Sequence, residues 1–379
     1  MARLGDIFII SSGGTPNKNE KSYYVNGTIP WVKTGDLKDK YVHKGIECIT
    51  EEGLNNSSAK LFPKDTVLVA MYGATIGACS ILSYEASTNQ ACAAFLPRED
   101  VFPEYLYYFL SSKKELFVKD GVGGAQPNIS AGYLKNVKFK LISLDEQQKV
   151  IDRLSKVDDL ISFRKQQLSK LDELVKSRFI EMLGEVVNSH KYSGVPLGTI
   201  CSTLSGGTPT TKVPEYYQGD IPWISTPYLG NNHINGDSAK AYITEDAIKN
   251  SATHLIPANT ILFGIRVGVG KSSIIDEPMC ANQDIVALMG IDTNKYNLLF
   301  VKHALDSYQS YFDSIKKGAT ILGITTDDLK KVLIPNVDIG LQNQFATFVE
   351  QTDKSKFEIQ KSLEKLETLK KALMQKYFG

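Results

Sequence analysis

The sequence predicts an α+β chain with two homologous globular domains, each followed by a long α-helix. An internal pseudo-twofold is expected to relate the two copies. Three observations lead to this prediction: short motifs that occur twice, strand-like apolar runs in both copies, and two stretches with apolar residues at seven-residue spacing. With 379 residues, the chain is long enough to bury two sizeable hydrophobic cores.

The repeat is carried by motifs that keep nearly one offset. Ser12–Pro16 (SGGTP) returns as Ser205–Pro209, 193 residues later (205 minus 12). Three dipeptides keep that offset, and an Ile-Pro-Trp motif returns one residue closer. The matched motifs are Leu4-Gly5 with Leu197-Gly198, Tyr23-Tyr24 with Tyr216-Tyr217, Asn89-Gln90 with Asn282-Gln283, and Ile29–Trp31 with Ile221–Trp223. So many motifs in one register indicate two copies of one unit, at 3–183 and 196–378, joined near 188–195.

The first part of each copy is expected to mix short strands with helices. Thr66–Tyr72 and Thr260–Arg266 are rich in β-branched and apolar residues, follow a proline and lead into glycines, as strands bounded by turns do. Pro103–Ser111 and Asn297–Leu305 are expected to be helical. The predicted domains are 1–142 and 196–338, with long helices at 143–184 and 339–379 and a linker at 185–195.

The two long helices carry apolar stripes. Asp145 and Glu146 sit in the expected first turn of the first helix, where negative charge suits the helix dipole. The stripe of the first helix contains Leu154, Ile161, Leu168 and Val175, and that of the second contains Ile359, Leu363, Leu366, Leu369 and Leu373. Sustained seven-residue spacing favours an antiparallel coiled coil over two helices that each pack on their own domain.

Composition excludes several classes of protein. No apolar run is long enough to span a membrane, and the first residues do not resemble a signal peptide, so a cytoplasmic protein is expected. Five cysteines without a C-x-x-C pair favour reduced thiols over disulfides or zinc. The formal net charge of +1 gives no overall field that would attract nucleic acid, so any positive potential must be local.

No motif for catalysis is found. Gly268–Ser272 ends like a phosphate-binding loop, but the second glycine of that pattern would fall at position 265, which is Ile265. The five histidines are scattered, and neither an adenine methyltransferase motif nor a cofactor loop is present. The chain is therefore expected to be non-enzymatic and to hold no cofactor or metal.

The motifs resemble a known family. Gly-Gly-Thr-Pro, paired tyrosines, Ile-Pro-Trp and Tyr72–Gly77 (YGATIG) are similar to the target recognition domains of specificity subunits in type I restriction-modification systems. The alternation of domain and long helix is also that family's layout, over essentially the whole chain. The second copy departs at Gly264–Gly270, which has Arg266 and lacks the Thr-Ile pair. This departure suggests that the two domains read different sequences.

The resemblance implies a DNA-reading subunit without chemistry of its own. Such a subunit assembles with methyltransferase subunits, usually two, and with restriction-translocation subunits in the nuclease form. Methylation and cleavage would belong to these partners. The helices would dock the methyltransferase subunits, and the two domains would read a split, asymmetric site in double-stranded DNA. A standalone tandem DNA-binding regulator and a protein-binding adaptor are the alternatives.

Matched residues are expected to build the fold, and unmatched residues beside them to read bases. The tryptophans are expected in the core, the Asn-Gln pairs in structural hydrogen bonds, and the Gly-Gly-Thr-Pro motifs in turns that need glycine torsions rather than at phosphates. Surface ion pairs or solvated loops remain alternatives for the readers. The candidate DNA-binding residues are Lys33, Thr34, Tyr72, Gln126, Asn128, Ser225, Thr226, Arg266, Lys316, Lys317 and Thr320.

The helices supply a second set of candidates. The coiled-coil and docking residues are Leu154, Ile161, Leu168, Val175, Ile359, Leu363, Leu366 and Leu373. A docking surface also needs apolar side chains beyond those that the two helices bury between them. The candidates for this excess are Phe163, Phe179, Ile180 and Met182.

Overall fold

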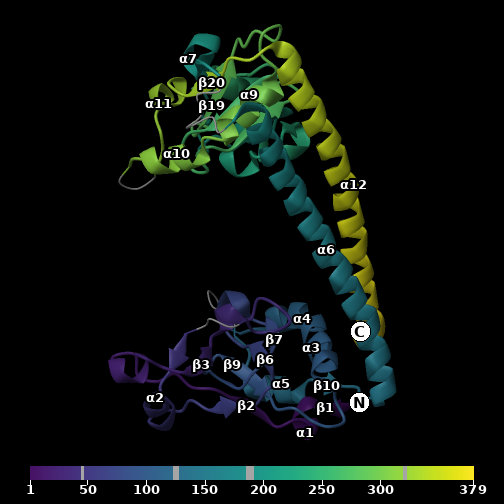
Figure 1. Ribbon diagram of the computed structural model, residues 1–379. Coiled ribbons are helices and arrows are strands. Elements are labelled where there is room, and N and C mark those ends of the chain that lie inside the picture. Colours follow the sequence, from purple (N-terminus) through teal and green to yellow (C-terminus); the bar gives the residue numbers. More distant parts are fainter. Residues whose placement is uncertain (44–46, 123–127, 185–191, 319–321) are drawn as a thin grey trace. The chain divides into compact units, whose positions relative to one another are not determined.

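The computed structural model describes residues 1–43, 47–122, 128–184, 192–318 and 322–379. These residues form two compact units. The first unit is Met1–Lys165 with Lys361–Gly379, and the second unit is Gln166–Gln360. The two long helices, α6 (Leu144–Leu183) and α12 (Ile339–Phe378), each contribute residues to both units (Figure 1).

The first unit contains an antiparallel four-stranded sheet whose two faces are both buried. Its strands, in spatial order, are β2 (Ile10–Ser12), β9 (Cys92–Phe95), β6 (Val67–Ala70) and β7 (Cys79–Ile81). Val67 and Val69 point to a core that includes helix α3 (Pro103–Ser112), while Leu68 and Ala70 point to a second sheet. Burial on both faces explains why the sequence of β6 is continuously apolar and does not alternate.

The second sheet of the first unit mixes parallel and antiparallel pairs. Its strands, in order, are β4 (Cys48–Ile49), β3 (Ile29–Val32), β8 (Ala86–Thr88) and β5 (Leu61–Phe62), with β3 and β8 parallel. A two-stranded ribbon joins β1 (Ala2–Arg3) to β10 (Lys138–Phe139). The short helices are α1 (Leu4–Ile7), η1 (Lys21–Tyr23), η2 (Thr34–Asp36), α2 (Glu51–Asn55), η3 (Gly73–Thr75), α4 (Lys114–Asp120) and α5 (Ala131–Asn136).

The second unit repeats this arrangement. Its larger sheet has the order β12 (Ser202–Ser205), β19 (Ile285–Met289), β16 (Thr260–Gly264), β17 (Ser272–Ile275) and β14 (His233–Ile234). The smaller sheet has the order β15 (Ala241–Ile243), β13 (Ile221–Ile224) and β18 (Cys280–Ala281), again with a parallel pair, β13 and β18. A ribbon pairs β11 (Gly194–Pro196) with β20 (Leu333–Pro335).

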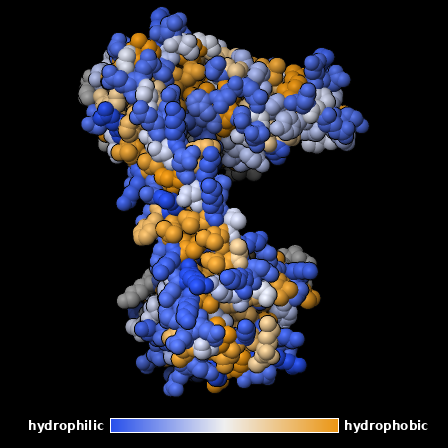
Figure 2. Space-filling view, turned by 90° about the vertical axis from the view of Figure 1, so that its right-hand side faces the viewer, coloured by the Kyte–Doolittle hydropathy of each residue, from blue (hydrophilic) through white to orange (hydrophobic). Residues whose placement is uncertain are grey.

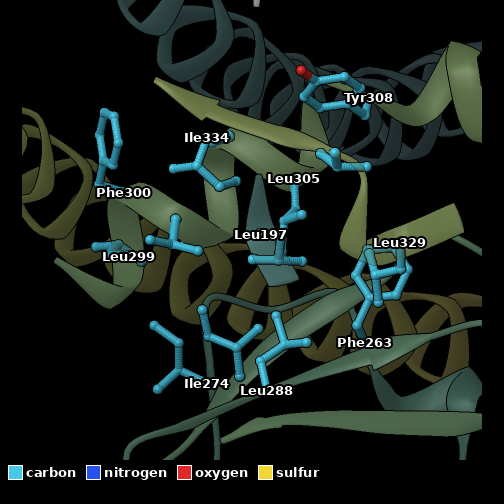
Figure 3. Close-up of a cluster of buried hydrophobic side chains, with 14 of the residues drawn as sticks. Leu197, Phe263, Ile274, Leu288, Leu299, Phe300, Leu305, Tyr308, Leu329 and Ile334 are labelled. Atoms are coloured by element: carbon cyan, nitrogen blue, oxygen red, sulfur yellow. The ribbon is translucent and has the colours of Figure 1, made fainter. Parts of the chain in front are cut away.

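Helices in the second unit occupy the places that the repeat predicts. Helix α9 (Leu298–Asp306) packs on β16 and β17, as α3 packs on β6 and β7 in the first unit. Figure 3 shows the core beneath it, where Phe263, Ile274 and Leu288 from the sheet lie near Leu299 and Leu305. The remaining helices are α7 (Leu197–Ile200), η4 (Pro214–Tyr217), η5 (Thr226–Tyr228), η6 (Gly236–Ser238), α8 (Glu245–Lys249), α10 (Gln309–Ile315) and α11 (Thr326–Lys330).

Helices α6 and α12 run antiparallel within each unit. In the first unit, Arg153 donates to the hydroxyl of Tyr377 (2.8 Å), and Asp158 pairs with Lys370 (2.6 Å), so partner numbers fall along α12 as they rise along α6. In the second unit, Asp172 pairs with Lys356 at 2.6 Å. Ser143 and Glu146 form reciprocal hydrogen bonds at the start of α6, which satisfy free amides of its first turn.

The ends of these helices also complete the cores of the globular parts. Leu154 lies in the core of the first unit, where Phe378 of α12 packs against the rings of Tyr105 and Phe109 at 5.4 and 5.9 Å. Val175 lies in the core of the second unit. These stripe residues therefore cover their own domains, the packing that the sequence analysis named as the alternative to a coiled coil. The partly buried stripe residues are Ile161, Leu168, Ile359, Leu366 and Leu373, and Leu363 is buried.

The expectation of excess apolar side chains on the helices is met in part. Phe163 and Ile180 are exposed, but Phe179 is buried between the rings of Phe300 and Phe345, and Met182 packs against the same core. Phe179 was misassigned because heptad spacing does not show where a globular domain covers a helix. Among the described residues, no helix has a stretch apolar enough, over a sufficient length, to cross a lipid bilayer.

Candidate nucleic-acid interface

The Gly-Gly-Thr-Pro motif closes against the strand that precedes the Asn-Gln pair. The Gly14 amide donates to the carbonyl of Thr88 (2.9 Å), and a Cβ on Gly13 would lie 1.9 Å from that oxygen. In the second copy, the Gly207 amide donates to the carbonyl of Ala281 (2.8 Å), and a Cβ on Gly206 would lie 2.2 Å from the carbonyl oxygen of Asn282. Neither Gly13 nor Gly14 has a positive φ, so the motif needs glycine for space rather than for the torsions that the sequence suggested.

The matched tryptophans bind this turn to the sheet that contains β3 in the first unit and β13 in the second. Trp31 and Trp223 are 2% and 5% exposed, which confirms that they belong to the core. Each indole donates to a glycine carbonyl at 3.0 Å, Trp31 to Gly14 and Trp223 to Gly207. The same elements are tied by further hydrogen bonds that both copies share: Tyr24 to Pro16 and Tyr217 to Pro209, and Thr15 to Gln90 and Thr208 to Gln283. Matched residues thus form one structural framework, built twice.

The segments that follow the tryptophans differ between the copies. Lys33 pairs with Glu47 at 2.6 Å, and this hydrogen bond raises the pKa of its ammonium group. Its Nζ lies 5.9 Å from the ring of Trp31, and Thr34 begins η2 beside it, partly exposed. Ser225 and Thr226 are only 6% and 1% exposed, so their hydroxyls lie inside the second unit.

Two candidate segments that are distant in the sequence meet in the first unit. Tyr72 forms a β-bridge with Asn128, and the amide of Ile129 donates to the carbonyl of Met71 at 2.9 Å. Val122 also bridges to Asn128, which closes the base of the loop between them. Tyr72, with 44% of its surface exposed, therefore lies at the foot of this loop.

The second unit has the same arrangement with different side chains. The amide of Ile324 donates to the carbonyl of Ile265 at 2.9 Å, as Ile129 does to Met71, and Lys317 bridges to Gly323. Arg266 therefore occupies the position in the second unit that Tyr72 occupies in the first. A Cβ on Gly323 would lie 3.0 Å from the Arg266 side chain, so the loop and the arginine are in close contact.

Acidic neighbours moderate the positive charge of this second loop. Arg266 lies 3.8 Å from Asp284, and its side chain remains more than half exposed. Lys316 pairs with Asp313 at 2.5 Å, and this bond, with a second from Gln309, lowers the pKa of the Asp313 carboxyl. The side chain of Lys317 is exposed. The candidates Gln126 and Thr320 lie outside the described residues.

The glycine-rich stretch at Gly268–Ser272 is a turn between two strands. Gly268 and Gly270 have φ values of +80° and +91°, and the Lys271 amide donates to the carbonyl of Gly268. Strand β17 follows it, whereas a phosphate-binding loop of the P-loop type precedes a helix. The sequence did not reveal that Met71 meets Ile129 or that Ile265 meets Ile324, because the two residues of each pair come together only on folding.

Comparisons with known proteins show the family of this chain. Residues 1–173 and 191–371 match the family described as Type I restriction modification DNA specificity domain. The chain is 30% identical over 284 residues to the type I restriction enzyme MjaIX specificity subunit of Methanocaldococcus jannaschii. That match covers 69% of this chain and 64% of the relative, so the chain spans slightly less than two thirds of that protein.

Two solved structures share the fold. A chain from "Structural basis underlying complex assembly and conformational transition of the type I R-M system" matches with a TM-score of 0.63 at 16% identity, covering 100% of this chain and 96% of that chain. The type I restriction-modification S subunit from M. genitalium matches with a TM-score of 0.53 at 16% identity, covering 100% and 95%. Because the family matches both copies of the repeat, this chain belongs to the type I restriction-modification specificity subunits and carries two target recognition domains.

Proposed function

We propose that the chain reads a split, asymmetric site in double-stranded DNA, with one half-site for each recognition domain. One observation carries this proposal. The same backbone hydrogen bonds, Ile129 to Met71 and Ile324 to Ile265, occur in both units. The described side chains beside them differ, with Tyr72 and Asn128 in the first unit and Arg266 and Lys317 in the second. Identical scaffolds with unlike contact residues suit two half-sites of different sequence, because base edges are distinguished by the side chains that reach them.

The side chains at these loops divide into two sets of readers. In the first unit, the tyrosine ring at 72 and the Asn128 amide can contact base edges, while Lys33 suits a phosphate and Thr34 either. In the second unit, Arg266 can pair with a guanine through two hydrogen bonds, and Lys317 and Lys316 suit phosphates. Ser225 and Thr226 would need to leave the interior to join them, since both are buried.

Methyltransferase subunits are proposed to dock on the helices. Exposed apolar side chains occur on the helical segments of both units, and Figure 2 shows hydrophobic side chains gathered on one helical stretch. In the first unit these exposed side chains include Leu160, Phe163 and Leu369, and in the second Leu174, Ile180 and Phe357. Adenine methylation and DNA cleavage would then belong to the methyltransferase and restriction-translocation partners, because the recognition domains supply contacts rather than chemistry.

The site itself is tested in a host free of adenine methylation. The chain is expressed with its neighbouring methyltransferase subunit, and the modified positions are read by single-molecule sequencing, with the methyltransferase alone as the control. A split motif with modified adenines that appears only with both subunits is expected. A soluble complex that leaves the DNA unmodified but binds duplex DNA would instead favour a standalone DNA-binding regulator.

Docking is tested separately on the helix surface. Phe163 is 59% exposed, so Phe163→Ser should leave the fold intact and weaken copurification of the methyltransferase subunit. Lys156→Ser on the same helix segment is the matched control, because Lys156 is exposed and polar. Equal recovery of the methyltransferase with both variants would remove this face from the proposed docking surface.

A further inference from the structure

Asp158 and Asp353 occupy the same position in the two long helices. Each follows the first residue of its helix by 14 positions, Leu144 in α6 and Ile339 in α12. Both carboxylates are partly buried, and both bind groups from the recognition domain of their own unit as well as a lysine of α12. An aspartate that contacts the recognition domain is therefore found at the same helix position in both copies of the repeat.

In the first unit, Asp158 binds side chains of α3 and α12 directly, and it reaches the loop after η2 through Tyr108. It accepts a hydrogen bond from the hydroxyl of the buried Tyr108 on α3 (2.8 Å) and pairs with Lys370 of α12 (2.6 Å). Lys40, from the loop that follows η2, places its Nζ 4.8 Å from the centre of the Tyr108 ring and 3.5 Å from its hydroxyl. The next residue, Tyr41, donates to Glu104 of α3 at 2.7 Å. The loop is thereby fixed to α3, and α3 to both long helices.

In the second unit, the corresponding contact is direct. The side-chain amide of Asn232 donates to Asp353 at 2.7 Å, and Lys356 lies 3.5 Å from the same carboxylate. Lys356 also pairs with Asp172 of α6 at 2.6 Å, so both helices take part again. His303 stands where α3 has Tyr108, and its buried Nε2 has no hydrogen-bond partner within the described ranges. The loop amide thus replaces the tyrosine as the donor.

The loop held by each aspartate continues the segment that follows the tryptophan. In the first unit this segment carries Lys33 and Thr34. In the second unit its exposed side chains include Tyr228 (46% exposed), whereas Ser225 and Thr226 are buried. Lys40 comes seven residues after Lys33, and Asn232 comes seven residues after Ser225. We propose that Asp158 and Asp353 are positioning residues, each of which holds the post-tryptophan segment of its own domain in place for one half-site. This inference rests on the proposed half-site reading. A reading site must hold its contacts within about 0.5 Å, so loosening the loop should weaken discrimination before it abolishes binding.

The test uses the full complex with the methyltransferase subunit and duplexes that carry the mapped site. Single-base changes are introduced in one half-site at a time, and methylation rates are compared with those of the intact site. Asp158→Asn should reduce discrimination by roughly tenfold in one half-site, and Asp353→Asn by a similar factor in the other half-site only. The unaffected half-site is an internal control against general loss of activity.

Matched controls and second variants separate positioning from folding. Asp152→Asn and Glu350→Gln remove the same charge at exposed positions on the same helices and should leave both half-sites unchanged. Tyr108→Phe should relax the half-site that Asp158→Asn relaxes, and Asn232→Ala the one that Asp353→Asn relaxes. These two variants decide the question if an aspartate variant fails to fold.

Two results would overturn the inference. Equal relaxation of both half-sites by one variant, or unchanged discrimination in folded variants, would show that the aspartates do not position separate readers. If the unmodified complex neither methylates nor distinguishes a split site, the proposed half-site reading itself fails. The two failures are distinguishable because the second is already visible before any substitution.

Discussion

The two recognition domains share the buried framework around their tryptophans but differ at an exposed position beside it. Trp31 and Trp223 donate to equivalent glycine carbonyls at the same 3.0 Å. Beside the neighbouring loop, however, the position of Tyr72 in the first unit is occupied by Arg266 in the second. The comparison teaches that the hydrogen-bonded framework fixes the position of a candidate contact residue, while the residue itself can change without disturbing the fold.

The largest expected effect is the loss of stability when either tryptophan of the shared framework is removed. Trp31→Ala and Trp223→Ala each leave a large cavity and an unpaired carbonyl, so each should cost its domain about 3–5 kcal/mol of stability. Denaturant unfolding of the purified chain, followed by hydrogen exchange in each domain, measures the effect. Trp→Phe at either site is the milder control. Clearly unequal losses in the two domains would show that the copies do not use the framework in the same way.

A smaller effect is expected at the glycines of the repeated turn. A Cβ on Gly14 would lie 2.3 Å from the backbone of Ser58, and one on Gly207 would lie 2.3 Å from that of Ala252. Each Gly→Ala variant should therefore destabilise its domain by about 1–3 kcal/mol through overpacking. Gly35→Ala is the control, because an added Cβ there meets nothing within 4 Å. Thermal unfolding that ranks Gly35→Ala with the other two variants would contradict this account.

The contact half of the comparison is tested at Arg266. Arg266→Ala should lose about 1–3 kcal/mol of discrimination at one base pair of one half-site, because the proposed bidentate contact to guanine is removed. Tyr72→Ala should act only in the other half-site. Binding titrations against duplexes with single-base changes measure both variants, with Lys249→Ala on the exposed helix α8 as the control. Loss of affinity that is uniform across all sequences would assign Arg266 to a phosphate.

The smallest expected effect concerns His303 and its counterpart Tyr108. Burial, with Lys302 as a further cause, lowers the pKa of His303 from 6.5 to about 4. The unfolded chain therefore binds a proton between pH 6.5 and 4 that the folded chain does not, so stability falls as pH decreases through this window. Between pH 7 and 5.5 the loss should be about 1 kcal/mol. His303→Tyr should remove this contribution, whereas the exposed His254→Tyr should not; unfolding curves at several pH values decide it.

Much of the fold could be predicted because duplication makes structural motifs visible within one chain. The strands at 66–72 and 260–266 appear as β6 and β16, and helices appear at 103–112 and 298–306, close to their predicted bounds. The candidate site was less accessible. The burial of Ser225 and Thr226 and the meeting of Tyr72 with Asn128 depend on tertiary packing, which neither periodicity nor composition records.

For the apolar stripes of the long helices, too, the sequence predicted one feature and missed another. Seven-residue spacing located the apolar face of α6, but it did not show that Phe179 would meet Phe300 and Phe345 inside a globular core. Similarly, the sequence pattern does not single out Asp158 and Asp353, because their partners from the recognition domains, Tyr108 of α3 and Asn232, reach them only through folding. Only their repeated place in the two helices could have singled them out.

The position of Phe378 in the core of the first unit has a consequence for the order of events on the ribosome. Chains fold as they emerge, and N-terminal domains usually complete their folding first. Here, however, Tyr105 and Phe109 receive their partner ring only after all of the second unit has been synthesised. The domain that is synthesised first therefore completes its core last. The apolar surface around Tyr105 and Phe109 lacks its partner ring throughout the translation of the second unit.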